Sequence, residues 1–334
     1  MLLVAASPDL DHHDVGPRHP ERPARVRAAL AGIDEAGLRD AVVSVEPRRA
    51  TEEELSLVHP VSYLEALRNF CEAGGGAIDP DTMAAPGSWD TALLAAGAAL
   101  EVVDALGRGE GDVAFVAARP PGHHALATEP MGFCLLNNIA VAAATLAQRG
   151  ERVLIVDWDV HHGNGTQAIF WDDPRVLYVS THQWPLYPGT GRVSETGGPG
   201  APGLTVNVPL PPRATGDVVL AALDEVAAPI VERFAPTWVL VSAGYDAHRA
   251  DPMAGLGLTA GDFADIANRV KAFAPGPGRL ALLLEGGYDL DALRVSVGSS
   301  LAALLGVEFR PEHASSNGPG DDAVDAARRA HAAP

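Results

Sequence analysis

The segment 157–166, DWDVHHGNGT, concentrates groups that could do chemistry at the end of one predicted strand. It follows the largely apolar run 152–156, which is typical of a buried parallel strand bounded by turn residues. Alternate residues of an extended segment point the same way, so Asp157, Asp159 and His161 share one face. Because buried carboxylates are costly unless they are neutralised, this spacing favours ligands of a divalent cation. The alternative is that Asp159 and His161 cap the strand end and are satisfied by hydrogen bonds.

Three other segments show the same arrangement of an apolar strand that runs into glycine and then into reactive groups. Residues 113–118 lead into RPPGHH, 238–241 lead into SAGYD, and 280–284 lead into EGGY. Helical patterns at 137–148, 216–234 and 259–273 separate these strands. Alternating strands and helices predict a parallel sheet with helices on both faces, and ligands of such sheets bind beyond the carboxyl ends of the strands. We therefore expect the four segments to converge on one crevice.

The rest of the chain completes one predicted α/β domain over residues 1–312, with a central and mostly parallel sheet. Further helices are expected at 23–36, 52–58, 62–73, 88–106 and 289–305, and further strands at 41–45, 176–181 and 204–210. Thr51 and Glu54 form a capping-box pattern at the start of one of these helices. The loop 183–203 is rich in glycine and proline, and loops of this length inside a compact domain usually have a function or are mobile. Residues 313–334 are small, polar and Ala-rich, and we expect a flexible tail there.

Composition narrows the classes of partner. The 334 residues are 47% hydrophobic and 20% charged, with a net charge of −19. So acidic a surface does not suit nucleic acid but would attract cationic substrates. No apolar run approaches membrane-spanning length, and the opening MLLVAA is better explained as a first strand than as a signal peptide. Only Cys71 and Cys134 are present, which indicates a reducing, cytoplasmic compartment without disulfides.

Nine motifs, in order from about residue 12 to residue 305, give the chain a specific resemblance. They are HPERPARV, VHPVSYLEAL, DTMAAPGSWDTALLAAG, RPPGHHA, MGFCLLNN, DWDVHHGNGTQAIF, YPGTGR, SAGYDAHRADPMAGL and LEGGYD. The chain resembles the zinc-dependent histone deacetylase family, whose fold is the arginase-like α/β architecture. The wording of RPPGHHA, MGFC, DWDVHHGNGTQ and LEGGY is similar to class II members, to bacterial deacetylase-like amidohydrolases and to their acetylpolyamine amidohydrolase relatives.

The resemblance implies one zinc ion per chain and a set of catalytic residues. Asp159, His161 and Asp246 match the family's zinc ligands, and three protein ligands leave a position for water and substrate. Zinc would lower the pKa of bound water and polarise a carbonyl. The matching catalytic residues are the tandem histidines His123 and His124, their partners Asp157 and Asn164, and Tyr288 as oxyanion donor. His124 would transfer protons and His123 would stay protonated beside Asp157, although Asn164 stands where class I members carry an aspartate.

Substrate-binding residues follow from the same resemblance. Gly132, Phe133 and Tyr187 match the walls of a narrow slot for acyl-lysine methylenes, although both aromatic residues could also be ordinary core residues. Asp81 matches a rim aspartate that holds the substrate backbone, with a turn-capping role in Asp79-Pro80-Asp81 as the competing explanation. Met253 lines the entrance, where acetylpolyamine-preferring relatives carry glutamate. Gly286, also expected at the substrate site, gives the backbone freedom that brings Tyr288 in.

Potassium is a second expected cofactor. One family site matches Asp157, Ser180 and the backbone of Asp159 and His161, because hard cations prefer oxygen ligands. A second site would use mainly backbone carbonyls, at Phe170, Asp173 and Val176.

The sequence thus predicts a zinc-dependent amidohydrolase that removes acetyl or other acyl groups from acylated lysine peptides or acetylated polyamines. A dimanganese ureohydrolase of the arginase type fits less well, because Asp246-Ala247-His248 lacks the second carboxylate. A non-catalytic binder of acetylated ligands is the third hypothesis, although no catalytic residue is lost. The physiological substrate and the oligomeric state stay open, as does the choice between zinc and ferrous iron.

Overall fold

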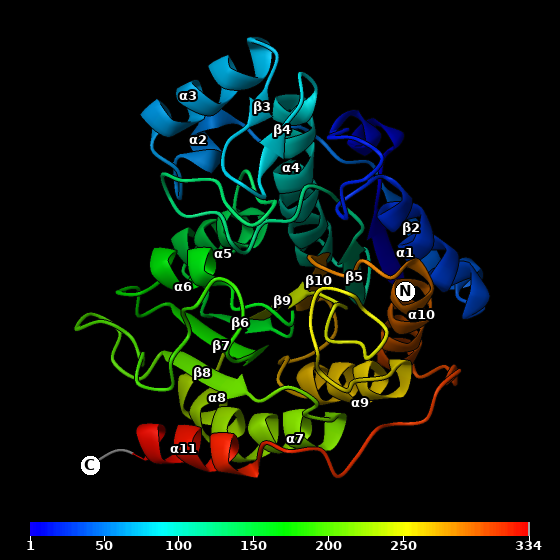
Figure 1. Ribbon diagram of the computed structural model, residues 1–334, viewed down its shortest axis with the longest axis vertical. Coiled ribbons are helices and arrows are strands. Elements are labelled where there is room, and N and C mark those ends of the chain that lie inside the picture. The colour runs from blue at the N-terminus through cyan, green and yellow to red at the C-terminus, as the bar shows by residue number, and fades with distance from the viewer. Residues whose placement is uncertain (333–334) are drawn as a thin grey trace.

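Short apolar runs form the strands of one central sheet in the computed structural model, which describes residues 1–332 (Figure 1). Within these residues the sheet has eight strands in the order β2-β1-β5-β10-β9-β6-β7-β8, and every neighbouring pair is parallel. The α/β fold with a parallel sheet is therefore confirmed. The strands are β1 (Leu2–Ala5), β2 (Val42–Val45), β5 (Val113–Val116), β6 (Val153–Asp157), β7 (Val176–Gln183), β8 (Thr205–Leu210), β9 (Trp238–Ala243) and β10 (Leu280–Leu284).

Helices connect these strands, and a small antiparallel pair lies outside the sheet. The pair is β3 (Gly76–Ala77) with β4 (Met83–Ala84). The longer helices are α1 (Ala24–Glu35), α3 (Val61–Glu72), α4 (Ser88–Gly107), α5 (Asn138–Gln148), α9 (Ala260–Lys271), α10 (Leu290–Leu305) and α11 (Asp321–His331). The shorter helical segments are η1 (Pro8–His12), η2 (Arg39–Ala41), α2 (Glu52–Leu55), α6 (Asn164–Ile169), α7 (Gly216–Ala221), η3 (Ala222–Ala227) and α8 (Ala228–Phe234).

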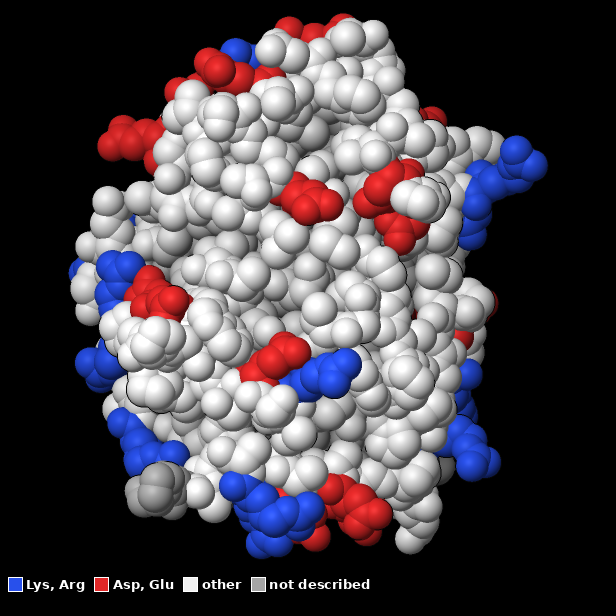
Figure 2. Space-filling model, turned by 60° about the vertical axis from the view of Figure 1, so that its left-hand side comes forward, with Lys and Arg blue, Asp and Glu red and all other residues white. Residues whose placement is uncertain are grey.

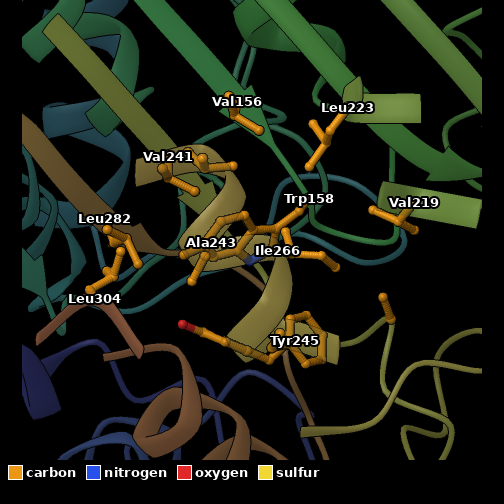
Figure 3. Close-up of a cluster of buried hydrophobic side chains, with 14 of the residues drawn as sticks. Val156, Trp158, Val219, Leu223, Val241, Ala243, Tyr245, Ile266, Leu282 and Leu304 are labelled. Carbon is orange, nitrogen blue, oxygen red and sulfur yellow. The ribbon is translucent and has the colours of Figure 1, made fainter. Parts of the chain in front are cut away.

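Every strand of the sheet except the edge strand β8 contributes side chains to two separate hydrophobic cores, one on each face. In β5, Val113 and Phe115 belong to one core, and Ala114 and Val116 belong to the other. This alternation follows from the two-residue period of a strand. Helices α1, α9, α10 and α11 cover the first core, and α3, α4 and α5 cover the second. Figure 3 shows part of the first core, where side chains of neighbouring strands meet Ile266 of α9.

Three predicted elements, two helices and one strand, differ from those observed. The capping box of Thr51 and Glu54 is present, but the helix that it starts, α2, ends at Leu55 rather than near residue 58. The apolar run that begins at Val113 leaves strand geometry after Val116. The helix predicted over 216–234 is interrupted by the π-helical turn η3, directly before Pro229 in the first turn of α8. Proline lacks the N–H that an uninterrupted α-helix would need, so the helix widens there.

The C-terminal segment is not the free tail that the sequence predicted. Helix α11 lies over the edge strand β8, with Val324 and Ala327 buried. Upstream of it, Ser315 donates to Asp262 through both its N–H and its hydroxyl, and the N–H of Gly318 donates to Thr215. Small residues such as Ala327 carry little hydrophobic signal in the sequence, but they allow close packing. Residues 333–334 of the predicted tail lie outside the described residues.

Three further features concern membrane-spanning helices, cysteines and surface charge. Among the described residues no helix is both long and apolar enough to cross a membrane. Cys71 and Cys134 are both free and buried. Figure 2 shows acidic and basic side chains scattered between large uncharged areas on one face of the molecule.

Candidate active site

Four adjacent strands carry the groups that the sequence singled out. In the sheet β5, β10, β9 and β6 are neighbours, and because they are parallel their carboxyl ends share one edge. The tandem histidines follow β5, Glu285 to Tyr288 follow β10, Asp246 follows β9, and Asp157 ends β6. The predicted convergence of four segments on one place is therefore seen in the structure.

Asp159, His161 and Asp246 form one buried cluster with metal-ligand character. One ligand atom from each residue lies within 4.8 Å of the others. The Nδ1 atom of His161 lies 3.1 Å from Oδ1 of Asp159 and 3.2 Å from Oδ2 of Asp246. The pairing of strand-end carboxylates with one imidazole matches the ligand set that the sequence predicted.

The charges of this cluster fit a cation. Burial disfavours a charged His161, yet the two carboxylates outweigh burial and raise the pKa of its imidazole to about 10. The two buried carboxylates thus favour positive charge beside them, and a divalent cation would supply it in place of the proton, because a ligating imidazole is neutral. Two glycines pack directly against these carboxylates, and no larger residue would fit in their place. A Cβ on Gly244 would lie 2.0 Å from Asp159, and one on Gly286 would lie 2.0 Å from Asp246. An Asp/His/Asp group of this kind fits a zinc site with three protein ligands.

The tandem histidines face different partners and have opposite pKa shifts. His123 Nδ1 lies 3.1 Å from Oδ2 of Asp157. Burial opposes its charge, but Asp157 and Asp159 raise the pKa of His123 to about 10. His124 Nδ1 lies 2.8 Å from Oδ1 of Asn164, and burial together with the charges of His123 and His161 holds the pKa of His124 well below its usual value. The pair thus combines one charged and one neutral imidazole.

Tyr288 lies in the turn between β10 and α10, beside the metal-ligand cluster. The N–H of Gly286 in this turn donates to Oδ2 of Asp159 at 2.8 Å. The guanidinium of Arg25 lies 4.9 Å from the centroid of the Tyr288 ring. Burial raises the pKa of Tyr288 well above 10, so its hydroxyl stays protonated as a hydrogen-bond donor.

The predicted slot residues lie around the histidines and Tyr288. Phe133 has its ring centroid 5.8 Å from that of Tyr288, and Tyr187 has its centroid 5.2 Å from that of His124. Gly132 has a φ of +56°, and a Cβ there would lie 2.4 Å from the His124 ring. Tyr187 is 37% exposed, which a core residue would not be. The two aromatic residues therefore lie beside the reactive groups.

Asp81 lies in the turn between β3 and β4, and the capping role in that turn belongs to its neighbour. Oδ1 of Asp79 accepts the backbone N–H of Asp81 at 2.9 Å, and it also accepts that of Thr82. The carboxylate of Asp81 instead accepts the hydroxyl of Thr82 at 3.0 Å. Thr82 in turn accepts the N–H of Phe133 at 3.3 Å, so the rim turn contacts the slot wall. Met253, the predicted entrance residue, is half-buried in the loop after β9.

The oxygen atoms expected to bind potassium are partly brought together. Asp157 and Ser180 are paired residues of β6 and β7, and both are fully buried. The carboxylate of Asp157 also accepts the N–H of Asp159 at 3.2 Å. At the second expected site Phe170, Asp173 and Val176 share one turn, in which the carbonyls of Phe170 and Asp173 accept backbone hydrogen bonds. Both potassium sites stay predictions.

Glu285, Arg25 and Glu21 are buried charged residues that support the site and that sequence reasoning missed. Glu285 accepts the N–H groups of Gly122 and His123 at 2.7 and 3.1 Å, so it holds the turn that carries the tandem histidines. Burial raises the pKa of Glu285 to about 7. Arg25 donates to the carbonyl of Gly287 at 2.6 Å, and Glu21 joins Arg25 to Arg119. Arg25 and Glu21 lie in the motif HPERPARV, where charged residues at helical spacing were the only available signal.

Comparison with known proteins agrees with this geometry. The histone deacetylase domain matches residues 19–304, so the chain belongs to the histone deacetylase family. A probable deacetylase of Archaeoglobus fulgidus is 42% identical over 303 residues, which cover 89% of this chain and 84% of that protein. The histone deacetylase-like amidohydrolase of Pseudomonas aeruginosa is 40% identical over 276 residues, covering 81% of this chain and 73% of that protein.

A solved structure extends the likeness to the whole fold. The crystal structure of the HDA15 HD domain matches with a TM-score of 0.90 at 34% sequence identity, covering 99% of this chain and 94% of that one. The family resemblance and the fold that the motifs predicted are both confirmed.

Proposed function

We propose that this protein is a zinc-dependent amidohydrolase that removes acetyl or other acyl groups from lysine side chains or polyamine-like amines. The observation that carries the proposal is the placement of the tandem histidines, one facing Asp157 and the other facing Asn164, beside the buried cluster of Asp159, His161 and Asp246. Family membership supports amide hydrolysis, and the cluster supports the use of a metal.

The cluster of Asp159, His161 and Asp246 would hold the zinc. When bound, zinc supplies a Lewis acid that polarises the substrate carbonyl and acidifies water. Potassium would bind nearby at the oxygen atoms of Asp157 and Ser180, which the strand register places side by side.

The chain's own groups move the protons. His124 is neutral, so it can accept a proton from the attacking water and later deliver it to the leaving amine. His123 stays charged beside Asp157 and adds positive charge where negative charge develops. The hydroxyl of Tyr288 donates to the carbonyl oxygen as it becomes an oxyanion, a contribution of about 3 kcal/mol for one such donor.

Phe133, Gly132 and Tyr187 would guide the substrate chain to these groups. Two aromatic rings and a glycine without a side chain suit a straight methylene chain and exclude a branched one. Asp81, freed from turn capping by Asp79, would accept a hydrogen bond from the substrate at the rim.

A dimanganese ureohydrolase is disfavoured by the geometry after β9. The Nε2 atom of His248 lies 2.7 Å from Glu312, so this imidazole is committed to the surface loop that Glu312 belongs to. Among the described residues the metal-ligand cluster comprises three side chains, which suits one ion.

Turnover of a substrate panel by the zinc-loaded protein tests the proposal. The panel comprises acetyl-lysine peptides, longer acyl-lysine peptides and acetylspermidine, with the release of free amine as readout. We expect multiple turnovers on acyl-lysine and their loss in His124→Ala. Stoichiometric binding without turnover on every substrate would instead favour a non-catalytic binder.

A further inference from the structure

Asp251 is a buried carboxylate that has no part in the proposed chemistry. It lies in the loop between β9 and α9 and is only 5% exposed. Its Oδ2 atom accepts the N–H of Tyr288 at 2.6 Å and that of Asp289 at 3.1 Å. Its Oδ1 atom accepts the N–H of Met253 at 3.0 Å. The carboxylate of Asp251 therefore binds the backbone of the turn that carries Tyr288 and the backbone of the entrance loop, which carries Met253.

The turn that carries Tyr288 depends on contacts from distant segments. It is neither strand nor helix, and Gly287 within it has a φ of +122°, a conformation that glycine adopts without strain. On one side Arg25 donates to the carbonyls of Glu285 and Gly287. On the other side the N–H groups of Tyr288 and Asp289 have Asp251 as their partner. Without Asp251 two part-buried N–H groups would lose their acceptor.

We propose that Asp251 is a positioning residue for Tyr288, which fixes the backbone of the tyrosine so that its hydroxyl meets the substrate carbonyl. This inference rests on the proposed function. An oxyanion donor acts only within a narrow range of distance and angle, and a displacement of about 1 Å costs on the order of 10²-fold in rate. The same carboxylate holds Met253, so the entrance loop and the catalytic tyrosine share one anchor.

Three single variants distinguish the positioning of Tyr288 by Asp251 from a merely structural role of this carboxylate. Asp251→Ala removes all three contacts, and we expect kcat to fall by roughly 10- to 100-fold while KM and zinc content change little. Asp251→Asn keeps an amide oxygen that can accept from Tyr288 and Asp289, so it should recover most of the lost kcat. Asp289→Ala is the matched control, because it removes the side chain that caps α10 at Ala292 but keeps the anchored backbone. It should stay within a few-fold of wild-type kcat.

A double-mutant cycle with Tyr288→Phe decides how Asp251 acts. Tyr288→Phe alone should lower kcat by roughly 10²–10³-fold. If Asp251 acts through the tyrosine hydroxyl, Asp251→Ala should cause little further loss in the Tyr288→Phe background.

The outcomes of this cycle separate the two proposals. The same fold loss from Asp251→Ala in both backgrounds would overturn the positioning role, as would a wild-type kcat in Asp251→Ala. If Asp251→Ala fails to fold, Asp251→Ser, whose side chain is shorter than the carboxylate that joins the two loops, takes its place in the cycle. A zinc-loaded wild type that hydrolyses no acylated amine would overturn the proposed function, and this role with it.

Discussion

The Nδ1 atom of His124 lies 2.8 Å from the Oδ1 atom of Asn164, so the second of the tandem imidazoles faces a neutral amide. The amide nitrogen of Asn164 contacts the sulfur of Met131 at 3.2 Å, which agrees with this orientation of the amide. Because the amide oxygen accepts, Nδ1 of His124 carries the proton and Nε2 is free to accept another. Burial and the charges of His123 and His161 keep the pKa of His124 low, although the hydrogen bond with Asn164 opposes this shift.

Replacing Asn164 by aspartate should move the pH dependence of hydrolysis. His124 must be neutral to act as a base, so activity is lost as the pH falls through its pKa. A carboxylate beside Nδ1 favours the imidazolium and raises that pKa, so the acid limb of the kcat/KM profile should shift to higher pH in Asn164→Asp. Profiles of wild type and variant on one acetyl-lysine peptide provide the measurement. An unchanged or lowered acid limb would show that His124 is not the base.

Replacing Met253 by glutamate should change substrate preference. Met253 offers no charge to a secondary ammonium, so we expect wild-type activity on acyl-lysine at least comparable to that on acetylspermidine. In Met253→Glu a partly desolvated carboxylate near that ammonium contributes on the order of 1 kcal/mol, so kcat/KM should shift several-fold towards the polyamine. Met253→Gln is the control for size without charge. A wild type that strongly prefers acetylpolyamines would contradict this account of the entrance.

Glu21 should make the stability of the protein sensitive to acid. Although burial opposes it, the guanidinium of Arg119 lowers the pKa of Glu21 from its ordinary 4.5 to about 2. A carboxyl group with a lowered folded-state pKa stabilises the fold above pH 4.5, and this contribution is lost as the pH falls towards 2. In Glu21→Gln, Arg25 and Arg119 stay buried without their counter-charge, so the free energy of unfolding should fall by about 3–5 kcal/mol.

Urea denaturation between pH 7 and pH 3 measures this effect. The wild type should lose stability faster on acidification than Glu21→Gln, which has no carboxyl group to titrate at this position. Asp34→Asn, which breaks the exposed pair with Arg39, is the control and should change stability little. Equal stability of wild type and Glu21→Gln at pH 7 would contradict the role of the buried pair.

The sequence predicted those parts of the site whose signal is local. Asp157, Asp159 and His161 stand at alternate positions of a strand end, so their shared face follows from strand geometry. The segment of Asp246 was expected at the same place because parallel strands end at one edge of the sheet, and its role as a ligand came from the family resemblance. The supporting residues have no such signal, since Arg25 contacts Gly287 across 262 positions of the chain.

Tertiary packing also decides the features that were predicted wrongly. Residues 321–331 form a helix because Val324 and Ala327 pack against the sheet, although their composition is typical of a free tail. Asp251 and Glu285 were overlooked, because nothing in the sequence distinguishes them from ordinary acidic residues of a loop and of a strand end. Only the fold shows that their carboxylates accept the backbone N–H groups of the turns that carry Tyr288 and the tandem histidines.

The dependence of hydrolysis on metal tests the central claim most directly. The protein is stripped with a chelator, its metal content is measured, and turnover of an acetyl-lysine peptide is followed before and after zinc is restored. The account predicts one zinc per chain, no turnover without it and recovery on its return, whereas Asp246→Ala should stay folded but neither retain zinc nor recover. Full activity in the metal-free protein would contradict the account.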